Sequence, residues 1–397
     1  MIDEGAGPML ESESEKNAVA ASLDEREPRE RGRRTLTLTI TQACNLSCSY
    51  CYEPFKTSQV MPLSVAVSAL HKHLKPDDSH HEVLIEVSGG EPISEFERVR
   101  DVCEWTWARA WPVPYLFFAT TNGTFVHGPV QDWFRRNRHR FWLGLSLDGT
   151  PQMHNTNRSN SYELIDIPFF RDTWPKQSVK MTVSRETLDN LAAGVMFLHK
   201  QGFSVQVNLA HGIDWTDAAS QEVFGRELHL LVEYYLANPA IEPCTLLTMP
   251  MSRLGLTDVD RRKWCGVGTD MVAIDVDGRE YPCHAFLPLA QGEGAREALP
   301  IDWTNIHSLR DPQCGDCVIE PICPTCYAIS HMNTGSASSR NRCLCALTKI
   351  RALACSKLEA ERIAQGGQEM KGYDHEVLLS IKGILRVQQA FGQAANG

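Results

Sequence analysis

Three cysteines, Cys44, Cys48 and Cys51, lie within eight residues and constrain the fold of this chain more than any other feature. They directly follow a strand-like run, residues 35–41. Three thiolates on one tight loop can hold three irons of a cubic 4Fe–4S cluster. The next cysteine is Cys103, so the fourth iron would be open to a ligand that is not protein. We therefore expect a reaction centre here. The alternative is a zinc knuckle, which usually needs four closed ligands.

Strand-like segments alternate with helical apolar patterns over the first part of the chain. Residues 115–119 form a nearly continuous apolar run, which is typical of a strand covered on both faces. The alternation predicts parallel βαβ units, and six such units predict an α/β fold of the open (β/α)6 partial TIM barrel type. Sites in such folds lie at the carboxyl ends of the strands. We expect the strands at residues 35–41, 83–88, 115–121, 141–147, 178–184 and 204–210.

The composition excludes several classes of protein. A chain of 397 residues can form two or three domains. The formal charge of −10 argues against a nonspecific nucleic-acid binder. No apolar run reaches the roughly 20 residues needed to cross a bilayer, and residues 1–30 lack the apolar core of a secretion signal. Fourteen cysteines without such a signal predict metal ligands in the reducing cytoplasm and no membrane association.

Changes in composition along the chain predict its domain organisation. Residues 1–33 lack apolar periodicity and are expected to form a disordered tail. The partial barrel would cover residues 34–240, followed by a linker over residues 241–264. A cysteine-rich domain would cover residues 265–350, and a helical segment residues 351–397.

Small and polar residues follow the predicted strands. The second strand ends in Ser-Gly-Gly-Glu-Pro, residues 88–92. Its glycines would let the backbone approach a ligand closely, and Glu91 can accept a hydrogen bond from an ammonium group. Later ends carry Asn122, Ser146 with Asp148, and Thr182. Ordinary turn chemistry is the alternative for Ser146 and Asp148. Arg158 follows the fourth strand, and its planar fork suits a carboxylate.

The cysteine-rich domain carries a second set of candidate metal ligands. Residues 271–282 read as a β-hairpin with an Asp-Gly turn, which would bring Cys265 close to Cys283. Zinc ribbons and further iron–sulfur clusters are both compatible with this pattern. The ligands exceed what one metal centre needs, so two centres are expected. The candidate ligands are Cys265, Cys283, Cys314, Cys317, Cys323, Cys326, Cys343 and Cys345.

The C-x3-C-x2-C loop with an aromatic residue before its last cysteine resembles the signature of the radical S-adenosylmethionine (radical SAM) superfamily. The Gly-Gly-Glu-Pro sequence after the second strand resembles the motif that holds the amino group of S-adenosylmethionine in that superfamily. Ser146 and Arg158 resemble the pair that binds its carboxylate. The resemblance implies a cofactor site formed by Tyr50, Ser88, Gly89, Gly90, Glu91, Asn122, Ser146, Arg158 and Thr182.

The second cysteine set resembles the SPASM extension of radical SAM enzymes, which implies two auxiliary 4Fe–4S clusters. The first would use Cys265, Cys283 and Cys326, with Cys343 or Cys244 as the fourth ligand, or with that site open. The second would use Cys314, Cys317, Cys323 and Cys345. This sequence departs from the SPASM pattern by having two residues rather than three between Cys323 and Cys326, and its last cysteine is either Cys343 or Cys345.

Enzymes with this architecture mostly modify peptides, so the resemblance implies a maturase of a ribosomally made peptide. Formation of a side-chain crosslink, either C–C or thioether, is the first expectation. Formylglycine formation and epimerisation are alternatives. A small-molecule dehydrogenase and a non-enzymatic iron–sulfur protein are alternatives from other classes. The expected partners are a precursor peptide and a flavodoxin- or ferredoxin-type reductant. A separate leader-recognition protein is a further candidate, because residues 1–33 are too short for a leader-binding domain.

Overall fold

The computed structural model describes residues 32–77, 79–175, 177–256, 263–292, 301–366 and 375–392. Its strands are β1 (Arg33–Thr41), β2 (Glu82–Gly89), β3 (Tyr115–Thr121), β4 (Phe141–Leu145), β5 (Ser178–Val183), β6 (Ser204–Leu209), β7 (Met271–Ile274) and β8 (Glu280–Tyr281). Its α-helices are α2 (Leu63–His73), α3 (Phe96–Trp107), α4 (Pro129–Asn137), α5 (Pro151–Asn157), α6 (Ile167–Thr173), α7 (Leu191–Lys200), α8 (Ala218–Ala237), α9 (Met251–Gly255), α10 (Pro288–Gln291), α11 (Tyr327–Thr334), α12 (Cys345–Gly366) and α13 (His375–Phe391).

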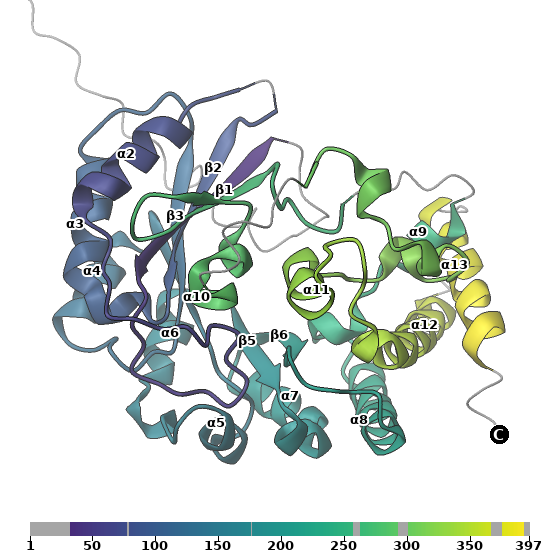
Figure 1. The fold of residues 1–397 in the computed structure, drawn as a ribbon. Helices are drawn as coiled ribbons and strands as arrows, with labels where there is room; N and C mark the ends of the chain where they lie inside the picture. Colours follow the sequence, from purple (N-terminus) through teal and green to yellow (C-terminus); the bar gives the residue numbers. More distant parts are fainter. Residues whose placement is uncertain are drawn as a thin grey trace, which may run out of the picture.

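The first six strands form the predicted parallel arrangement. Strands β1 to β4 pair in sequence order, β5 pairs with β6, and a bridge between Ser146 and Lys180 joins the two sheets. Helices α2, α3 and α4 lie outside the strands, and α10 and α11 lie on the other side (Figure 1). The predicted (β/α)6 partial barrel is confirmed, and each predicted strand lies within two residues of its observed bounds.

Apolar residues and threonines alternate along strand β1, so that its two faces have different roles. Leu36, Leu38 and Ile40 are fully buried in the main apolar core. The intervening threonines alternate with them along the strand and are also fully buried, and Thr37 donates a 2.7 Å hydrogen bond to the Glu86 carboxylate of β2. One face of β1 is therefore apolar, whereas the other supplies hydroxyl groups to the interior of the barrel.

The predicted hairpin of the cysteine-rich segment exists, but it belongs to the barrel sheet. Strand β7 pairs antiparallel with β8 and parallel with β1, so the sheet order is β4-β3-β2-β1-β7-β8. Gly278 has a positive φ of 88°, as the Asp-Gly turn requires. The domain predicted at residues 265–350 thus shares a continuous sheet with the barrel.

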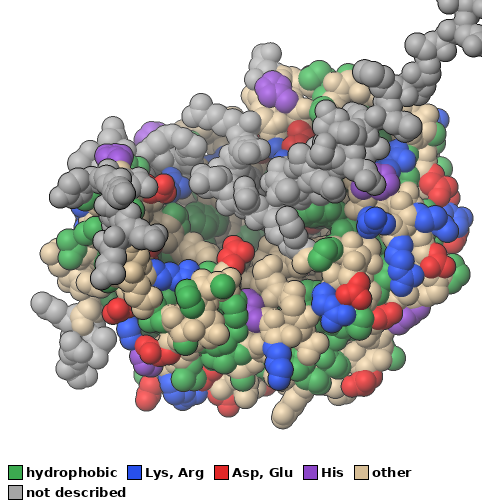
Figure 2. Space-filling model, turned by 180° about the vertical axis from the view of Figure 1, so that it is seen from behind, with side chains coloured by type: hydrophobic (Ala, Val, Ile, Leu, Met, Phe, Trp, Pro, Cys, Tyr) green, Lys and Arg blue, Asp and Glu red, His purple; other side chains and the backbone are tan. Residues whose placement is uncertain are grey.

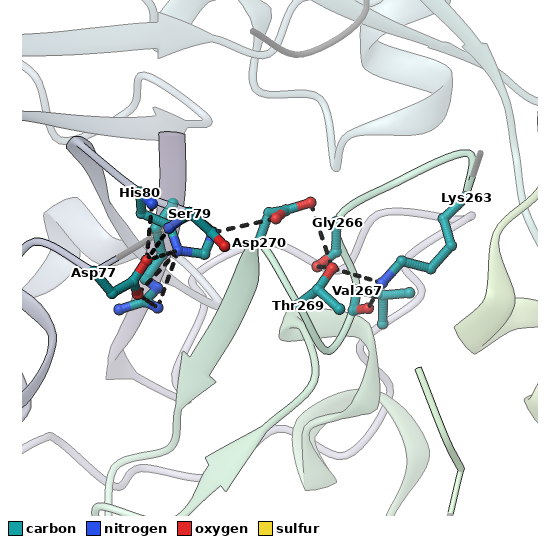
Figure 3. A network of polar contacts seen from close by, with 9 residues as sticks. Asp77, Ser79, His80, Lys263, Gly266, Val267, Thr269 and Asp270 are labelled. Atoms are coloured by element: carbon teal, nitrogen blue, oxygen red, sulfur yellow. Dashed lines mark hydrogen bonds and ion pairs between the residues drawn. The ribbon is translucent and has the colours of Figure 1, made fainter. Parts of the chain in front are cut away.

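A polar network attaches the start of the cysteine-rich segment to the barrel (Figure 3). The His80 ring lies between two carboxylates, 2.9 Å from Asp77 and 3.1 Å from Asp270. Lys263 donates to the Val267 carbonyl and to the Thr269 hydroxyl at 2.8 and 2.6 Å. These contacts fix the backbone on both sides of the loop that follows Cys265.

The region predicted as a linker contains a packed helix. Helix α9 crosses α13 closely, because Cβ atoms at Gly255 and Gly383 would lie only 2.1 and 2.0 Å from carbonyl oxygens of the opposite helix. Helix α13 also packs against α12, at the side of the molecule away from α2 (Figure 1). Of the predicted N-terminal tail, residues 1–31 lie outside the described residues, and Arg33 already belongs to β1.

The surface carries charges of both signs. On the face shown in Figure 2, Lys and Arg side chains are interspersed with Asp and Glu side chains. Within the described ranges, no helix has the length and apolar character needed to cross a membrane.

Candidate functional site

A cavity of about 400 Å³ lies at the carboxyl ends of the barrel strands and is lined by the predicted site residues. Its wall includes the ends of β2, β3 and β6 together with the loop after β1. All three cysteines of that loop and all nine predicted cofactor residues line it: Cys44, Cys48, Cys51, Tyr50, Ser88, Gly89, Gly90, Glu91, Asn122, Ser146, Arg158 and Thr182.

The two glycines at the end of β2 hold the cysteine loop in place. Gly90 N–H donates to the Thr41 carbonyl at 3.1 Å, and Glu91 N–H donates to the Ala43 carbonyl at 2.8 Å. A Cβ at Gly89, where φ is +134°, would lie 1.9 Å from the Thr41 oxygen, and one at Gly90 would lie 2.4 Å from the Ala43 oxygen. The close approach expected toward a ligand is thus an approach to the backbone that leads into Cys44.

Glu91 is buried and joins the end of β2 to the end of β3. Its carboxylate accepts hydrogen bonds from Thr121 Oγ1 at 2.7 Å, from Asn122 N at 2.7 Å and from Ile93 N at 3.0 Å. Burial raises the pKa of Glu91, although these hydrogen bonds oppose the rise. A carboxylate can accept about four hydrogen bonds. Glu91 therefore keeps acceptor capacity for a donor in the cavity.

Asp148 orients Arg158 and Tyr50. The fully buried Asp148 carboxylate accepts from Arg158 Nε at 3.0 Å and from the Tyr50 hydroxyl at 2.5 Å. Its other oxygen accepts from Thr182 N at 2.9 Å. Within the described residues, Nε is the Arg158 atom that forms hydrogen bonds, so both terminal nitrogens remain available. This geometry fits the predicted role of Arg158 as a carboxylate ligand. Ordinary turn chemistry was the alternative considered for Asp148, and its hydrogen bond to Arg158 was not predicted from the sequence.

His154 belongs to the supporting structure behind Arg158. It is fully buried, and burial lowers its pKa to about 4, so the ring is neutral. Asp148 N–H donates to its Nδ1 at 3.3 Å, and its Nε2 contacts Ser161 Oγ at 3.0 Å. Both ring nitrogens are occupied, which makes His154 a structural residue.

Sequence reasoning missed a charged cluster that lines the same cavity. Glu86, at the centre of β2, lies 3.7 Å from Nδ1 of His284, and Lys180 of β5 donates to Thr120 Oγ1 at 2.8 Å. Burial alone would raise the pKa of Glu86, but His284, Lys180 and Thr37 lower it to about 2. A glutamate inside an otherwise apolar strand, Val-Leu-Ile-Glu-Val, was the signal that could have revealed it.

Glu53, which follows the cysteine loop, belongs to the same cavity wall. Burial raises the pKa of Glu53 to about 7, even though the nearby His284 opposes the rise. The cavity thus contains a carboxylate that is ionised at neutral pH and another that titrates near neutrality.

The first auxiliary set predicted from the sequence comes together in the structure. Cys265, Cys283 and Cys326 pack in one cluster with Phe286 and Tyr327. Burial, together with the neighbouring thiols of Cys326 and Cys265, raises the pKa of Cys283 to about 12.

The second set also comes together, and the Cys345 thiol lies near those of Cys314 and Cys323. Burial raises the pKa of Cys323 to about 11. This value includes the opposing effect of Arg340 and the raising effects of the nearby Cys345, Cys317 and Cys314 thiols. Burial raises the pKa of the Cys345 thiol, and the nearby Cys317 thiol adds to the rise.

The remaining candidates for these sets lie elsewhere. Cys343 lies beside Asp214 and Trp215, in the loop after β6. Cys244 is buried in the main core, where its N–H bonds to the Tyr235 hydroxyl at 2.8 Å.

Within the described ranges, no three Cys, His, Asp or Glu side chains are close enough to share one metal ion. In a zinc site every thiolate lies roughly 2.3 Å from the ion. The choice between zinc and iron–sulfur clusters at these two thiol sets stays a prediction.

Comparisons with known proteins agree with the fold. No protein-family model matches the chain. An uncharacterised protein of Methanocaldococcus jannaschii is 28% identical over 121 residues, which is 30% of this chain and 40% of that protein. The match therefore spans less than half the length of this relative.

Two solved structures have the same fold. The structure of anSMEcpe with bound AdoMet and the Cp18Cys peptide matches 85% of this chain and 100% of its own, with a TM-score of 0.63 and 16% identity. Streptococcus suis SuiB bound to precursor peptide SuiA matches 86% of this chain and 83% of its own, with a TM-score of 0.54 and 16% identity. Both likenesses extend over most of this chain and confirm the predicted fold class.

Proposed function

We propose that this chain is a radical SAM enzyme that modifies a ribosomally made peptide. The observation that carries the proposal is the meeting of twelve predicted residues around one cavity, from segments spread over residues 44–182. Cys44, Cys48 and Cys51 would hold the 4Fe–4S cluster, and the same cavity would take S-adenosylmethionine. An electron carrier would have no need for a carboxylate-binding arginine beside its cluster.

The chain's own residues would bind and orient the cofactor. Arg158, held by Asp148, would present its two terminal nitrogens to the cofactor carboxylate, and Glu91 would accept from the amino group. When bound, the cluster and S-adenosylmethionine supply a 5′-deoxyadenosyl radical that takes a hydrogen atom from the substrate. The Tyr50 hydroxyl donates a hydrogen bond to Asp148 and so connects the cysteine loop to the residues that orient Arg158.

A peptide substrate is supported by two structural neighbours that were solved with bound peptides. One contains the Cp18Cys peptide and the other the precursor peptide SuiA. For this chain we propose an intramolecular side-chain crosslink. The substrate would lose one hydrogen atom to the 5′-deoxyadenosyl radical, which becomes 5′-deoxyadenosine, and a second hydrogen as a proton and an electron. A crosslinked product would therefore be lighter by about 2 Da. The first and second auxiliary cysteine sets are candidates to hold the cluster that accepts this electron.

The proposal is tested on the anaerobically reconstituted chain with dithionite or a flavodoxin-type reductant. We expect cleavage of S-adenosylmethionine to 5′-deoxyadenosine, and no cleavage by the Cys44/Cys48/Cys51→Ala variant. Iron should fall from about twelve atoms per chain to about eight in that variant. About four irons that fall to none, with zinc present, would instead mean a single cluster beside a zinc domain.

The substrate is tested separately with peptides encoded beside the gene for this chain. Mass spectrometry should show a loss of about 2 Da for a crosslink, whereas epimerisation would leave the mass unchanged. Oxidation of serine to formylglycine also removes about 2 Da, so fragmentation must show that two residues are joined. Cofactor cleavage without any change in these peptides would favour a small-molecule substrate. A pull-down with neighbouring gene products would show whether a separate protein recognises the leader.

A further inference from the structure

All fourteen cysteines lie in the described part of the chain, so their assignment can be complete. Three belong to the loop after β1, three to the first auxiliary set and four to the second. The remaining cysteines are Cys103, Cys244, Cys343 and Cys355.

Three of these four are buried in the main apolar core. Cys103 lies on the inner face of α3 and is fully buried. Cys244 bonds through its N–H to Tyr235, and Cys355 of α12 donates its thiol to the Leu246 carbonyl at 3.3 Å. The first auxiliary set packs in a separate apolar cluster, which contains none of these three cysteines.

The fourth, Cys343, lies beside the loop after β6 and outside the apolar cluster of the first auxiliary set. Its N–H bonds to Asn341 Oδ1 at 3.2 Å at the start of a short 3-10 helix, Arg342–Leu344. Its thiol lies beside Asp214 and Trp215, outside the apolar cluster around Cys283. Two residues later, Cys345 belongs to the second set.

We propose that the first auxiliary cluster is held by Cys265, Cys283 and Cys326 alone, so that one of its irons has no thiolate ligand. This inference rests on the proposed function. The nearest imidazole along the chain is that of His284, which faces Glu86 at 3.7 Å. An iron without a thiolate can take an added sulfur or nitrogen donor, whereas an iron with four sulfur neighbours is closed.

The position of the cluster gives this open iron a place near the main cavity. Tyr52 packs against the apolar cluster that contains Cys265, Cys283 and Cys326, and it also lines the cavity. His284, which directly follows Cys283, lines the cavity too. The first auxiliary set therefore lies behind one wall of the proposed substrate site.

The experiment uses the Cys44/Cys48/Cys51→Ala variant, because the radical cluster has an open iron of its own. The reconstituted variant is oxidised with ferricyanide, and 3Fe–4S clusters are quantified by EPR spectroscopy. A cubic cluster with one unprotected iron loses that iron on oxidation, so we expect about one 3Fe–4S cluster per chain. Added 2-mercaptoethanol should change the EPR spectrum of the reduced cluster, because its thiolate would bind the open iron.

Two further substitutions in this background serve as matched controls. Cys343→Ala and Cys244→Ala should each leave the iron content and the 3Fe–4S signal unchanged. If either cysteine were the fourth ligand, the starting variant would give no 3Fe–4S signal and the added substitution would create one, which would overturn the inference. Cys326→Ala should lose about four irons, which assigns the signal to the first auxiliary set.

The outcomes separate this inference from the proposed function. About eight irons without any 3Fe–4S signal after oxidation would refute only the three-cysteine cluster. The absence of iron with zinc in its place would refute the auxiliary clusters altogether. Circular dichroism of each variant shows whether the chain is folded before its iron is counted.

Discussion

Asp148→Asn tests the arrangement that prepares Arg158 for a carboxylate. Asp148 is fully buried and forms hydrogen bonds with Arg158 Nε, the Tyr50 hydroxyl and Thr182 N. An asparagine has almost the same shape, and its oxygen can still accept from Thr182 N. It removes the negative charge that balances Arg158, and its amide nitrogen cannot accept the hydrogen bond from Tyr50.

The magnitude follows from the burial of the pair. The side chains of Arg158 and Asp148 are 10% and 0% exposed. Removing one partner of a buried ion pair usually costs about 3–5 kcal/mol, and retention of the Thr182 bond places this variant at about 3 kcal/mol. If the Arg158 fork also loses its orientation, binding of S-adenosylmethionine should weaken by about 10- to 100-fold, because charged hydrogen bonds contribute about 1.5–3 kcal/mol.

Urea unfolding of the apoprotein measures the stability, and calorimetric titration of the reconstituted protein measures cofactor affinity. Asp132→Asn is the matched control, because Asp132 pairs with Arg135 at 3.1 Å on the surface, where their side chains are 62% and 50% exposed. We expect the control to change stability by less than about 1 kcal/mol. Equal small effects of both substitutions, with unchanged cofactor affinity, would refute the role assigned to Asp148.

Three further predictions address the rest of the cavity wall. Gly90→Ala should release about four irons per chain while leaving the auxiliary clusters, because its Cβ would lie 2.4 Å from the Ala43 carbonyl; iron analysis and EPR measure the loss. Glu91→Gln should destabilise the apoprotein by about 2 kcal/mol, because the new amide NH₂ group would face at least one of the three groups that donate hydrogen bonds to Glu91. Urea unfolding measures this effect, and an unchanged midpoint would contradict it. The pKa of Glu86 is about 2 when folded and 4.5 ordinarily, so its contribution is present above pH 4.5 and is lost as the pH falls toward 2. Apoprotein stability should therefore exceed that of Glu86→Gln by about 3 kcal/mol more at pH 6 than near pH 2, and parallel pH profiles would contradict this.

Local spacing made part of the site predictable. The positions of Cys44, Cys48 and Cys51 within one loop follow from the chain itself, and strand periodicity placed residues such as Ser146 at strand ends. Because parallel strands end at the same edge of the sheet, separate strand ends were expected to meet, and the cavity confirms that they do.

Contacts between distant segments were not accessible to the same reasoning. Glu86 and His284 are separated by almost two hundred residues, and they meet because β7 pairs with β1. Apolar periodicity predicts that β7 is a strand, but it does not select the neighbour of that strand. Similarly, the spacing of Cys343 and Cys345 fits either ligand, and only the fold of Arg342–Leu344 separates the two thiols.

The pairing of β7 with β1 also determines how the cysteine groups relate to each other. Strand β1 leads directly into the loop of Cys44, and β8, the hairpin partner of β7, leads into Cys283. At the carboxyl ends of β1 and β7, Gln42 donates a buried 2.9 Å hydrogen bond to Asp275. The proposed radical cluster site and the proposed first auxiliary site are thus attached to β1 and β8 of one sheet, with β7 between them. Removing residues 265–350 would expose the edge of β1, the strand that leads into the proposed reaction centre. The two regions that sequence composition separates are therefore expected to fold as one unit, with the separation of these two sites fixed by the β1–β7 register.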